Sequence, residues 1–178
     1  MRLFVIRHGQ TDNNVRGRMT GRFDEDINET GVEQAAEARR QIEDIDYDVI
    51  LASPLKRASH TADIVNCKNL PVQYDDRLLE RDMGFLTNVE RHRNLDKHDF
   101  WNISPETDYR DAEPLRDMYD RVGEFFEDIK LRYSGKTVLA VTHDGVVRVL
   151  HSYLNGIPEH GALLEGNIKN CEIREIRE

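Results

Sequence analysis

The hydrophobic positions of the chain form short apolar runs that alternate with longer segments of helical periodicity. Three runs, at 3–6, 49–52 and 137–141, are apolar except for Thr137 and contain β-branched residues. Such runs are typical of strands that are buried on both faces of a parallel sheet. Two weaker runs, at 72–74 and 172–176, predict short edge strands, and charged side chains protect the second of them.

Four segments between these runs carry apolar residues at helical spacing, at 32–45, 54–65, 115–131 and 145–154. Thr30 is the candidate N-cap of the first, with Glu33 three residues later. The alternation of strands and helices predicts an α/β protein. We expect a three-layer sandwich, with a mostly parallel central sheet and helices on both of its faces.

One segment interrupts this alternation. Residues 89–114 are charged and turn-rich, with few apolar positions. We interpret them as a small cap insertion in a single domain that spans 1–178, because a chain of 178 residues suits one hydrophobic core.

Polar residues follow each of the three buried runs. Arg7 and His8 follow the first, Arg57 lies about one helical turn after the second, and His143 follows the third. The carboxyl ends of parallel strands meet at one edge of a sheet, where ligands of α/β proteins bind. If the strands are neighbours, two guanidinium groups and two imidazoles converge on one pocket. Such a pocket suits a compact dianion such as a phosphate group.

Composition narrows the range of partners. The formal net charge is −9, which argues against nucleic acid and against an anionic membrane surface. The two cysteines, Cys67 and Cys171, are far apart and have no metal-ligand spacing, so we expect reduced thiols and a cytoplasmic location. The sequence shows no secretory signal and no apolar stretch long enough to cross a membrane. It leaves the oligomeric state open.

Four motifs in order resemble the histidine phosphatase, or phosphoglycerate mutase-like, superfamily. They read RHG at 7–9, SPLKRA at 53–58, LER at 79–81 and VTHDGV at 141–146. The resemblance implies a phosphatase that needs no cofactor and no metal, in which His8 becomes a phosphohistidine and Glu80 exchanges protons with the leaving group and with water. It also implies a set of groups that hold the phosphoryl group, namely Arg7, Arg57, His143, Asn14 and the backbone near Gly21.

The chemistry of imidazole agrees with this implied role. Imidazole attacks phosphorus only when it is neutral, so one ring nitrogen of His8 must be free and the other must be a fixed donor. Nearby arginines would lower the pKa of His8 and keep it neutral. Forked guanidinium donors can also bridge the equatorial oxygens of a phosphoryl group during its transfer.

Several residues are candidates for contact with the rest of the substrate. The positions close to the motifs are Arg22, Phe23, Arg81 and Met83, and those in the predicted cap are Trp101, Tyr109 and Arg110. We expect a phosphomonoester hydrolase acting on a small phosphorylated metabolite. The alternatives are phosphoryl transfer of the phosphoglycerate mutase type, and a non-catalytic relative that only binds a phosphorylated ligand.

Asp144 and Thr20 depart from the family pattern, which often has Gly and Gln at these positions. A carboxylate at 144 would repel a phosphate unless it points away or pairs with an arginine. The adjacent His143 and Asp144 could instead belong to a metal site, although no other His/Asp set with ligand spacing accompanies them.

Overall fold

The computed structural model describes residues 1–90, 96–104 and 111–177. Its strands are β1 (Arg2–Arg7), β2 (Val49–Ala52), β3 (Val72–Tyr74), β4 (Thr137–Thr142) and β5 (Ile173–Ile176). Its α-helices are α1 (Asp12–Val15), α2 (Glu29–Ile42), α3 (Lys56–Val65), α4 (Lys97–Phe100), α5 (Leu115–Arg132) and α6 (Asp144–Asn155). Two 3₁₀ turns, η1 (Asp76–Leu78) and η2 (Gly84–Leu86), lie between β3 and α4.

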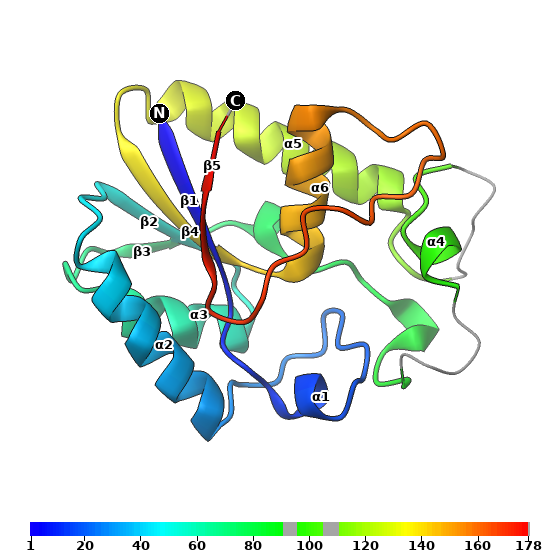
Figure 1. Ribbon diagram of the computed structural model, residues 1–178, viewed down its shortest axis with the longest axis horizontal. Helices are drawn as coiled ribbons and strands as arrows, with labels where there is room; N and C mark the ends of the chain where they lie inside the picture. Colours follow the sequence, from blue (N-terminus) through cyan, green and yellow to red (C-terminus); the bar gives the residue numbers. More distant parts are fainter. Residues whose placement is uncertain (91–95, 105–110, 178) are drawn as a thin grey trace.

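The strands form a single sheet in the order β3-β2-β4-β1-β5 (Figure 1). β1, β2, β3 and β4 run parallel, and β5 pairs antiparallel with β1 at the edge. The predicted α/β architecture and mostly parallel sheet are confirmed, and so are the two edge strands.

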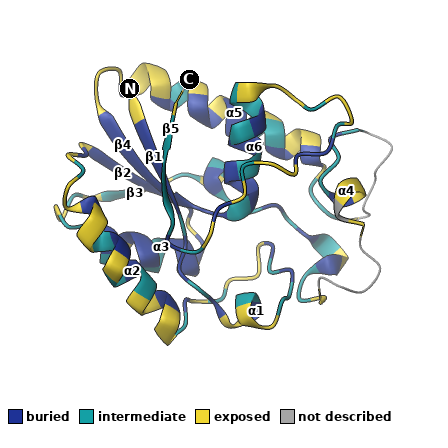
Figure 2. Ribbon diagram, in the orientation of Figure 1, coloured by how far each residue is buried: buried dark blue, intermediate teal, exposed yellow. Residues whose placement is uncertain are grey.

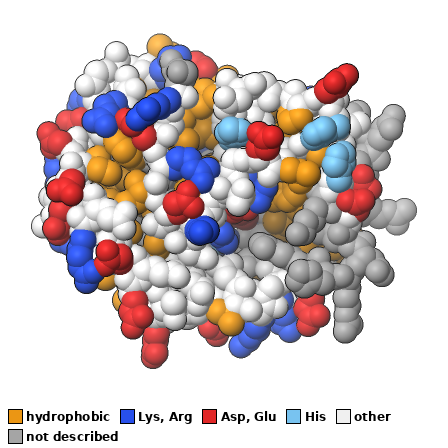
Figure 3. Space-filling view, in the orientation of Figure 1, with side chains coloured by type: hydrophobic (Ala, Val, Ile, Leu, Met, Phe, Trp, Pro, Cys, Tyr) orange, Lys and Arg blue, Asp and Glu red, His pale blue; other side chains and the backbone are white. Residues whose placement is uncertain are grey.

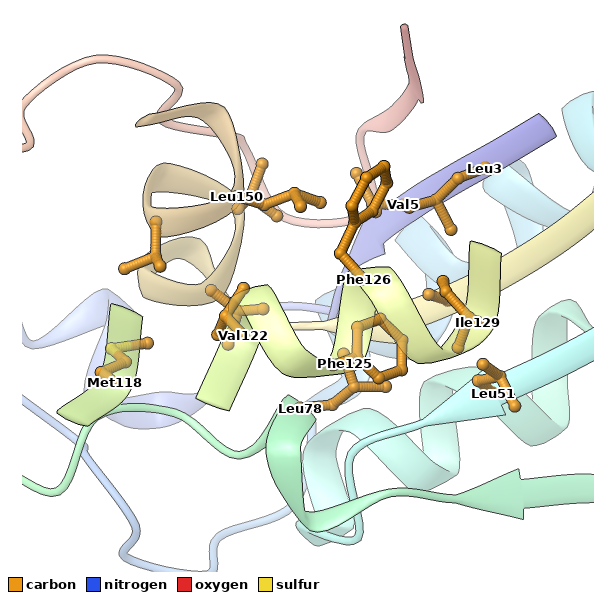
Figure 4. Close-up of a cluster of buried hydrophobic side chains, with 14 of the residues drawn as sticks. Leu3, Val5, Leu51, Leu78, Met118, Val122, Phe125, Phe126, Ile129 and Leu150 are labelled. Atoms are coloured by element: carbon orange, nitrogen blue, oxygen red, sulfur yellow. The ribbon is translucent and has the colours of Figure 1, made fainter. Parts of the chain in front are cut away.

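The buried strands separate two hydrophobic clusters by the two-residue period of their side chains. In β1, Leu3 and Val5 belong to the cluster beneath α5 and α6, whereas Phe4 and Ile6 belong to the one beneath α2 and α3. Figure 4 shows the first cluster, in which side chains of α5 and α6 pack against β1 and β2. The helices are buried on their sheet-facing sides and exposed on their outer sides (Figure 2). This explains why the strands are largely apolar while the helices are amphipathic.

The first long helix begins earlier than predicted. Asn28, not Thr30, is the N-cap of α2, because its extended backbone lets Oδ1 accept a hydrogen bond from the Gly31 amide at 2.9 Å. The preceding polar loop also contains the short helix α1, in which Thr11 and Asn14 form a capping box.

The segment 89–114 is described only in part, since residues 91–95 and 105–110, including Tyr109 and Arg110, lie outside the described ranges. The described part contains α4, and its backbone pairs with the loop after α6. Ile103 donates to the Gly161 carbonyl at 2.9 Å, and Leu163 donates to the Trp101 carbonyl at 2.8 Å. The role of this segment as a cap stays a prediction. Within the described ranges, none of the helices combines the length and apolarity that a membrane span requires.

Candidate active site

The sheet register brings the ends of three strands together. Arg7 of β1 lies opposite Thr142 of β4, and Ala52 of β2 lies opposite Val141. The next backbone amides continue this alignment, since His8 donates to the Thr142 carbonyl at 2.9 Å and Ser53 donates to that of Val141 at 3.0 Å. The residues that follow β1, β2 and β4 therefore start from one edge of the sheet.

His8 is held in one neutral tautomer. Its side chain is buried, and Nδ1 lies 2.7 Å from the Gly9 carbonyl oxygen. A carbonyl oxygen can only accept, so Nδ1 carries the proton and the lone pair resides on Nε2. Burial lowers the pKa of His8 well below its usual range, and the charges of Arg57 and Arg7 add to the effect. The lowering expected from the sequence is found, with burial as its larger cause.

Arg57 extends from the first turn of α3 and is 1% exposed. Nη1 donates to the Phe23 carbonyl at 2.9 Å and Nη2 to the Gly21 carbonyl at 2.7 Å, while Nε is buried with no partner among the described residues. The Arg7 guanidinium donates from Nη1 to the Ile168 carbonyl at 2.9 Å. Both guanidinium groups are thus fixed by neutral carbonyl oxygens, and these hydrogen bonds do not neutralise their positive charges.

His143 lies beside His8, with ring centroids 5.2 Å apart. Its Nε2 is 2.8 Å from the Ser53 hydroxyl, and Nδ1 is buried without a partner in the described part of the chain. Burial lowers the pKa of His143 well below its usual range, and the positive charges of Arg57 and Arg7 add to the effect. The two imidazoles that the sequence predicts to converge do so, and both are neutral at physiological pH.

Glu80 reaches the same pocket from the chain after η1. Its carboxylate accepts from the Arg81 amide at 2.8 Å and from the Gly145 amide at 3.3 Å. Residue 145 must be glycine for this approach, because a Cβ there would stand 2.2 Å from Glu80 Oε1. The first turn of α6 therefore fixes the carboxylate in the pocket.

Arg7, His8, Arg57 and Glu80 line a cavity of about 150 Å³, whereas His143 is fully buried beside His8 and is not part of the lining. By chemistry the lining residues fall into two sets. The set that we call the basic end is Arg7, His8, Asn14, Gly21 and Arg57, and the set that we call the apolar end is Met19, Met83, Phe100, Trp101 and Leu164, with Arg148 beside them. Thr20, Glu80 and Asp144 complete the lining.

Asn14 and Gly21 occupy defined places at the basic end. Asn14 Oδ1 accepts from the Thr11 amide at 3.2 Å and from Asn170 Nδ2 at 3.1 Å, and its own Nδ2, which has no hydrogen-bond partner among the described residues, can donate to a ligand. Gly21 has φ +54°, and its carbonyl holds Arg57.

The residues suggested for substrate contact have different positions. Met83 lines the pocket, as does Trp101. Arg81 is 2% exposed and stacks on the Phe100 ring, with Cζ 4.3 Å from the centroid, so its guanidinium is packed inside the protein. Arg22 pairs with Glu113 at 3.3 Å and Phe23 is half exposed, both outside the cavity lining.

Asp144 does not face the pocket as a lone charge. Its Oδ2 accepts from Arg148 Nε at 2.8 Å, and its Oδ1 accepts from the Ile168 amide at 2.9 Å. The pairing with an arginine that the sequence argument required is present. Within the described ranges, no three or more His, Cys, Asp or Glu side chains are grouped so as to hold a metal ion.

Sequence reasoning missed five residues around the pocket. Met19, Phe100, Arg148 and Leu164 line it, and Asn170 donates to the His8 carbonyl at 2.9 Å. Of these residues, only Arg148 could have been identified from the sequence, because it lies one helical turn after Asp144, where opposite charges can pair.

Comparisons with known proteins agree with this geometry. The chain matches the family model of the histidine phosphatase superfamily (branch 1) over residues 3–178. It is 32% identical over 163 residues to phosphoserine phosphatase 1 of Hydrogenobacter thermophilus, covering 88% of this chain and 77% of that protein. It is 30% identical over 174 residues to a 2,3-bisphosphoglycerate-dependent phosphoglycerate mutase of Bradyrhizobium diazoefficiens, covering 90% of this chain and 84% of that protein.

A solved structure of Bacillus stearothermophilus YhfR superposes with a TM-score of 0.86 at 29% identity, covering 99% of this chain and 90% of that one. The matched range includes all four motifs, and with them His8 and His143. The chain therefore belongs to the histidine phosphatase superfamily, branch 1.

Proposed function

We propose that the chain hydrolyses small phosphomonoesters, with His8 as the nucleophile and the basic end of the pocket as the phosphoryl site. The observation that carries this assignment is the tautomer of His8. Its Nδ1 proton is held by the Gly9 carbonyl, and its pKa is lowered, so Nε2 presents a lone pair beside two guanidinium groups.

In the first step, Nε2 attacks phosphorus and forms a P–N bond while the P–O bond to the leaving group breaks. Charge accumulates on the equatorial oxygens, where Arg7, Arg57 and the Asn14 amide would donate hydrogen bonds. Glu80, in its protonated form, gives its proton to the leaving alkoxide. His143 Nδ1, when it carries the proton of the neutral ring, is a further donor to the phosphoryl group.

In the second step, Glu80 is a carboxylate and takes a proton from water as the water oxygen attacks phosphorus. The P–N bond breaks, the electron pair returns to Nε2, and inorganic phosphate is formed. Glu80 and His8 are then in their starting states.

The test is trapping of phosphate on the protein together with measurement of phosphate release. Rapid quench with a ³²P-labelled phosphomonoester should leave label on His8, and a malachite-green assay should show stoichiometric release of phosphate. Phosphate binding without label on His8 would support the non-catalytic alternative.

The similarity to a phosphoglycerate mutase favours one alternative reaction, return of the phosphoryl group to a sugar acid. Isomerisation of a phosphoglycerate without net phosphate release would support it. We favour hydrolysis because the relatives named as phosphatases include five that match the chain at 31–33% identity, against 30% for this mutase.

The cavity volume favours small substrates. Acidic and basic side chains are interspersed on the face shown in Figure 3, which is unlike a nucleic-acid-binding surface. The free thiols Cys67 and Cys171 are consistent with a reducing compartment, and we therefore propose the cytoplasm as the location.

A further inference from the structure

The carboxylate of Asp144 is fully engaged at the start of α6. Arg148, one turn later on the same helix, donates from Nε to Oδ2, and the Ile168 amide donates to Oδ1. Both side chains of the pair are largely buried, with exposed fractions of 18% and 17%. The pair therefore links α6 to the chain that follows it, with its charges balanced.

That chain, residues 164–171, which we call the return segment, lies between α6 and β5 without regular secondary structure. Its backbone groups need partners outside the segment. Arg148 donates to the Leu164 carbonyl, and Arg174 of β5 donates to the carbonyls of Gly166 and Asn167 at 2.9 and 2.8 Å. Charged side chains from α6 and β5 thus determine where the return segment lies.

The return segment in turn holds groups of the basic end. The Ile168 carbonyl accepts from Arg7 Nη1 at 2.9 Å, and Asn170 Nδ2 donates to the His8 carbonyl at 2.9 Å. Ile168 is therefore fixed through both of its backbone polar groups, its amide by Asp144 and its carbonyl by Arg7. It is also buried, with its side chain in the hydrophobic cluster beneath α5 and α6.

We propose that Asp144 is a positioning residue for phosphate binding, which acts through Ile168 on the orientation of Arg7. This inference rests on the proposed function in one respect, the assignment of Arg7 to the phosphoryl site. The effect of Asp144 on phosphate affinity is then favourable, although its own charge opposes a dianion.

The opposite signs of these two effects provide the test. If Asp144 acted only through its charge, its removal would strengthen phosphate binding. If it positions Arg7, its removal weakens phosphate binding, because the Arg7 guanidinium then no longer presents its donors to the phosphate oxygens in the right orientation.

The experiment measures the dissociation constant of inorganic phosphate by calorimetry and its inhibition constant against p-nitrophenyl phosphate. Asp144→Ala should weaken phosphate binding about tenfold. Asp144→Asn retains an oxygen that can accept from the Ile168 amide and should restore most of the affinity. Glu43→Gln, which removes one charge from the exposed Arg39–Glu43 pair of α2, is the matched control and should bind phosphate like the wild type.

A double-mutant cycle with Arg7 separates positioning from a general loss of structure. In the Arg7→Ala background, Asp144→Ala should change phosphate affinity by less than about twofold. Tighter phosphate binding by Asp144→Ala, or an equal loss in both backgrounds, would overturn the inference. Asp144→Gly replaces Asp144→Ala in the cycle if the alanine variant does not fold.

Failure of this inference about Asp144 can be distinguished from failure of the proposed function. A wild-type protein that binds phosphate but releases none from phosphomonoesters would refute the proposed hydrolysis. The calorimetric cycle would still decide whether Asp144 acts through Arg7.

Discussion

At the basic end of the pocket, Arg7 and His8 lie at the end of the buried strand β1 and Arg57 lies in the first turn of α3, which follows β2, whereas Trp101 and Leu164 at the apolar end lie in irregular chain. Arg7 and His8 are fixed by the register of β1 against β4, and both imidazoles are buried. Trp101 and Leu164 come from two loops that pair with each other through isolated backbone bonds. We infer from this difference that residues at the sheet edge determine which reaction takes place, whereas residues of the loops determine which substrates bind.

Substitution of His8 should have the largest effect and should not depend on the leaving group. His8→Ala removes the proposed nucleophile, so kcat/KM should fall by about 10⁴-fold or more for every phosphomonoester. Steady-state assays with an aryl and an alkyl phosphate test this, and thermal melting should show that the fold is retained. His60→Ala, at an exposed histidine paired with Asp26, is the control. Residual activity within about tenfold of the wild type would mean that another group attacks phosphorus.

The same contrast explains how much the sequence could predict. The apolar runs at 3–6, 49–52 and 137–141 indicate strands, because the central strands of a parallel sheet are buried on both faces. The polar residue after each strand then identifies the basic end. These inferences need only local pattern and the rule that ligands bind at the carboxyl ends of strands.

Prediction of the apolar end from the sequence would have required knowledge of long-range packing. Trp101 reaches the pocket because its backbone pairs with Leu163, more than sixty residues away, and no local pattern encodes that pairing. Ile168 acts through its backbone carbonyl, which every residue type has, so the sequence carries no signal for it. Arg81, a charged residue in one of the motifs, was a candidate for contact with the substrate. Its guanidinium is instead buried against the Phe100 ring.

Glu80 also lines the pocket, and its substitution should affect substrates with poor and with good leaving groups differently. Glu80→Gln keeps the shape but cannot donate or take a proton, so kcat/KM for an alkyl phosphate should fall about a hundredfold. An activated nitrophenyl ester, whose leaving group needs no proton, should lose less than about fivefold in its phosphorylation step. Burst kinetics measure that step, with Glu43→Gln as the control. Equal losses for both esters would remove Glu80 as the proton donor.

The buried imidazoles should also make stability depend on pH. Because the pKa of His8 and that of His143 are lowered in the folded state, the unfolded chain binds more protons below about pH 6.5. The free energy of unfolding should therefore fall as pH decreases from about 6.5, by up to about 1.4 kcal/mol per pH unit for each histidine. Urea denaturation at two pH values measures the slope, and His8→Asn should reduce it. An unchanged slope in that variant would contradict the lowered pKa of His8.

The smallest effect is expected at the apolar end and should depend on the leaving group. The Trp101 ring lines the pocket and has the Arg148 guanidinium 5.4 Å from its centroid, so its face is held in a fixed orientation. Trp101→Ala should lower kcat/KM about fivefold for esters with an apolar leaving group, since one aromatic contact contributes about 0.5–1.5 kcal/mol. Ethyl phosphate, whose leaving group offers little apolar surface for the ring to contact, should be affected least, and Trp101→Phe should retain most of the selectivity. Equal losses for large and small esters would show that Trp101 supports the basic end as well, and the division of the pocket into a reaction end and a selection end would then be wrong.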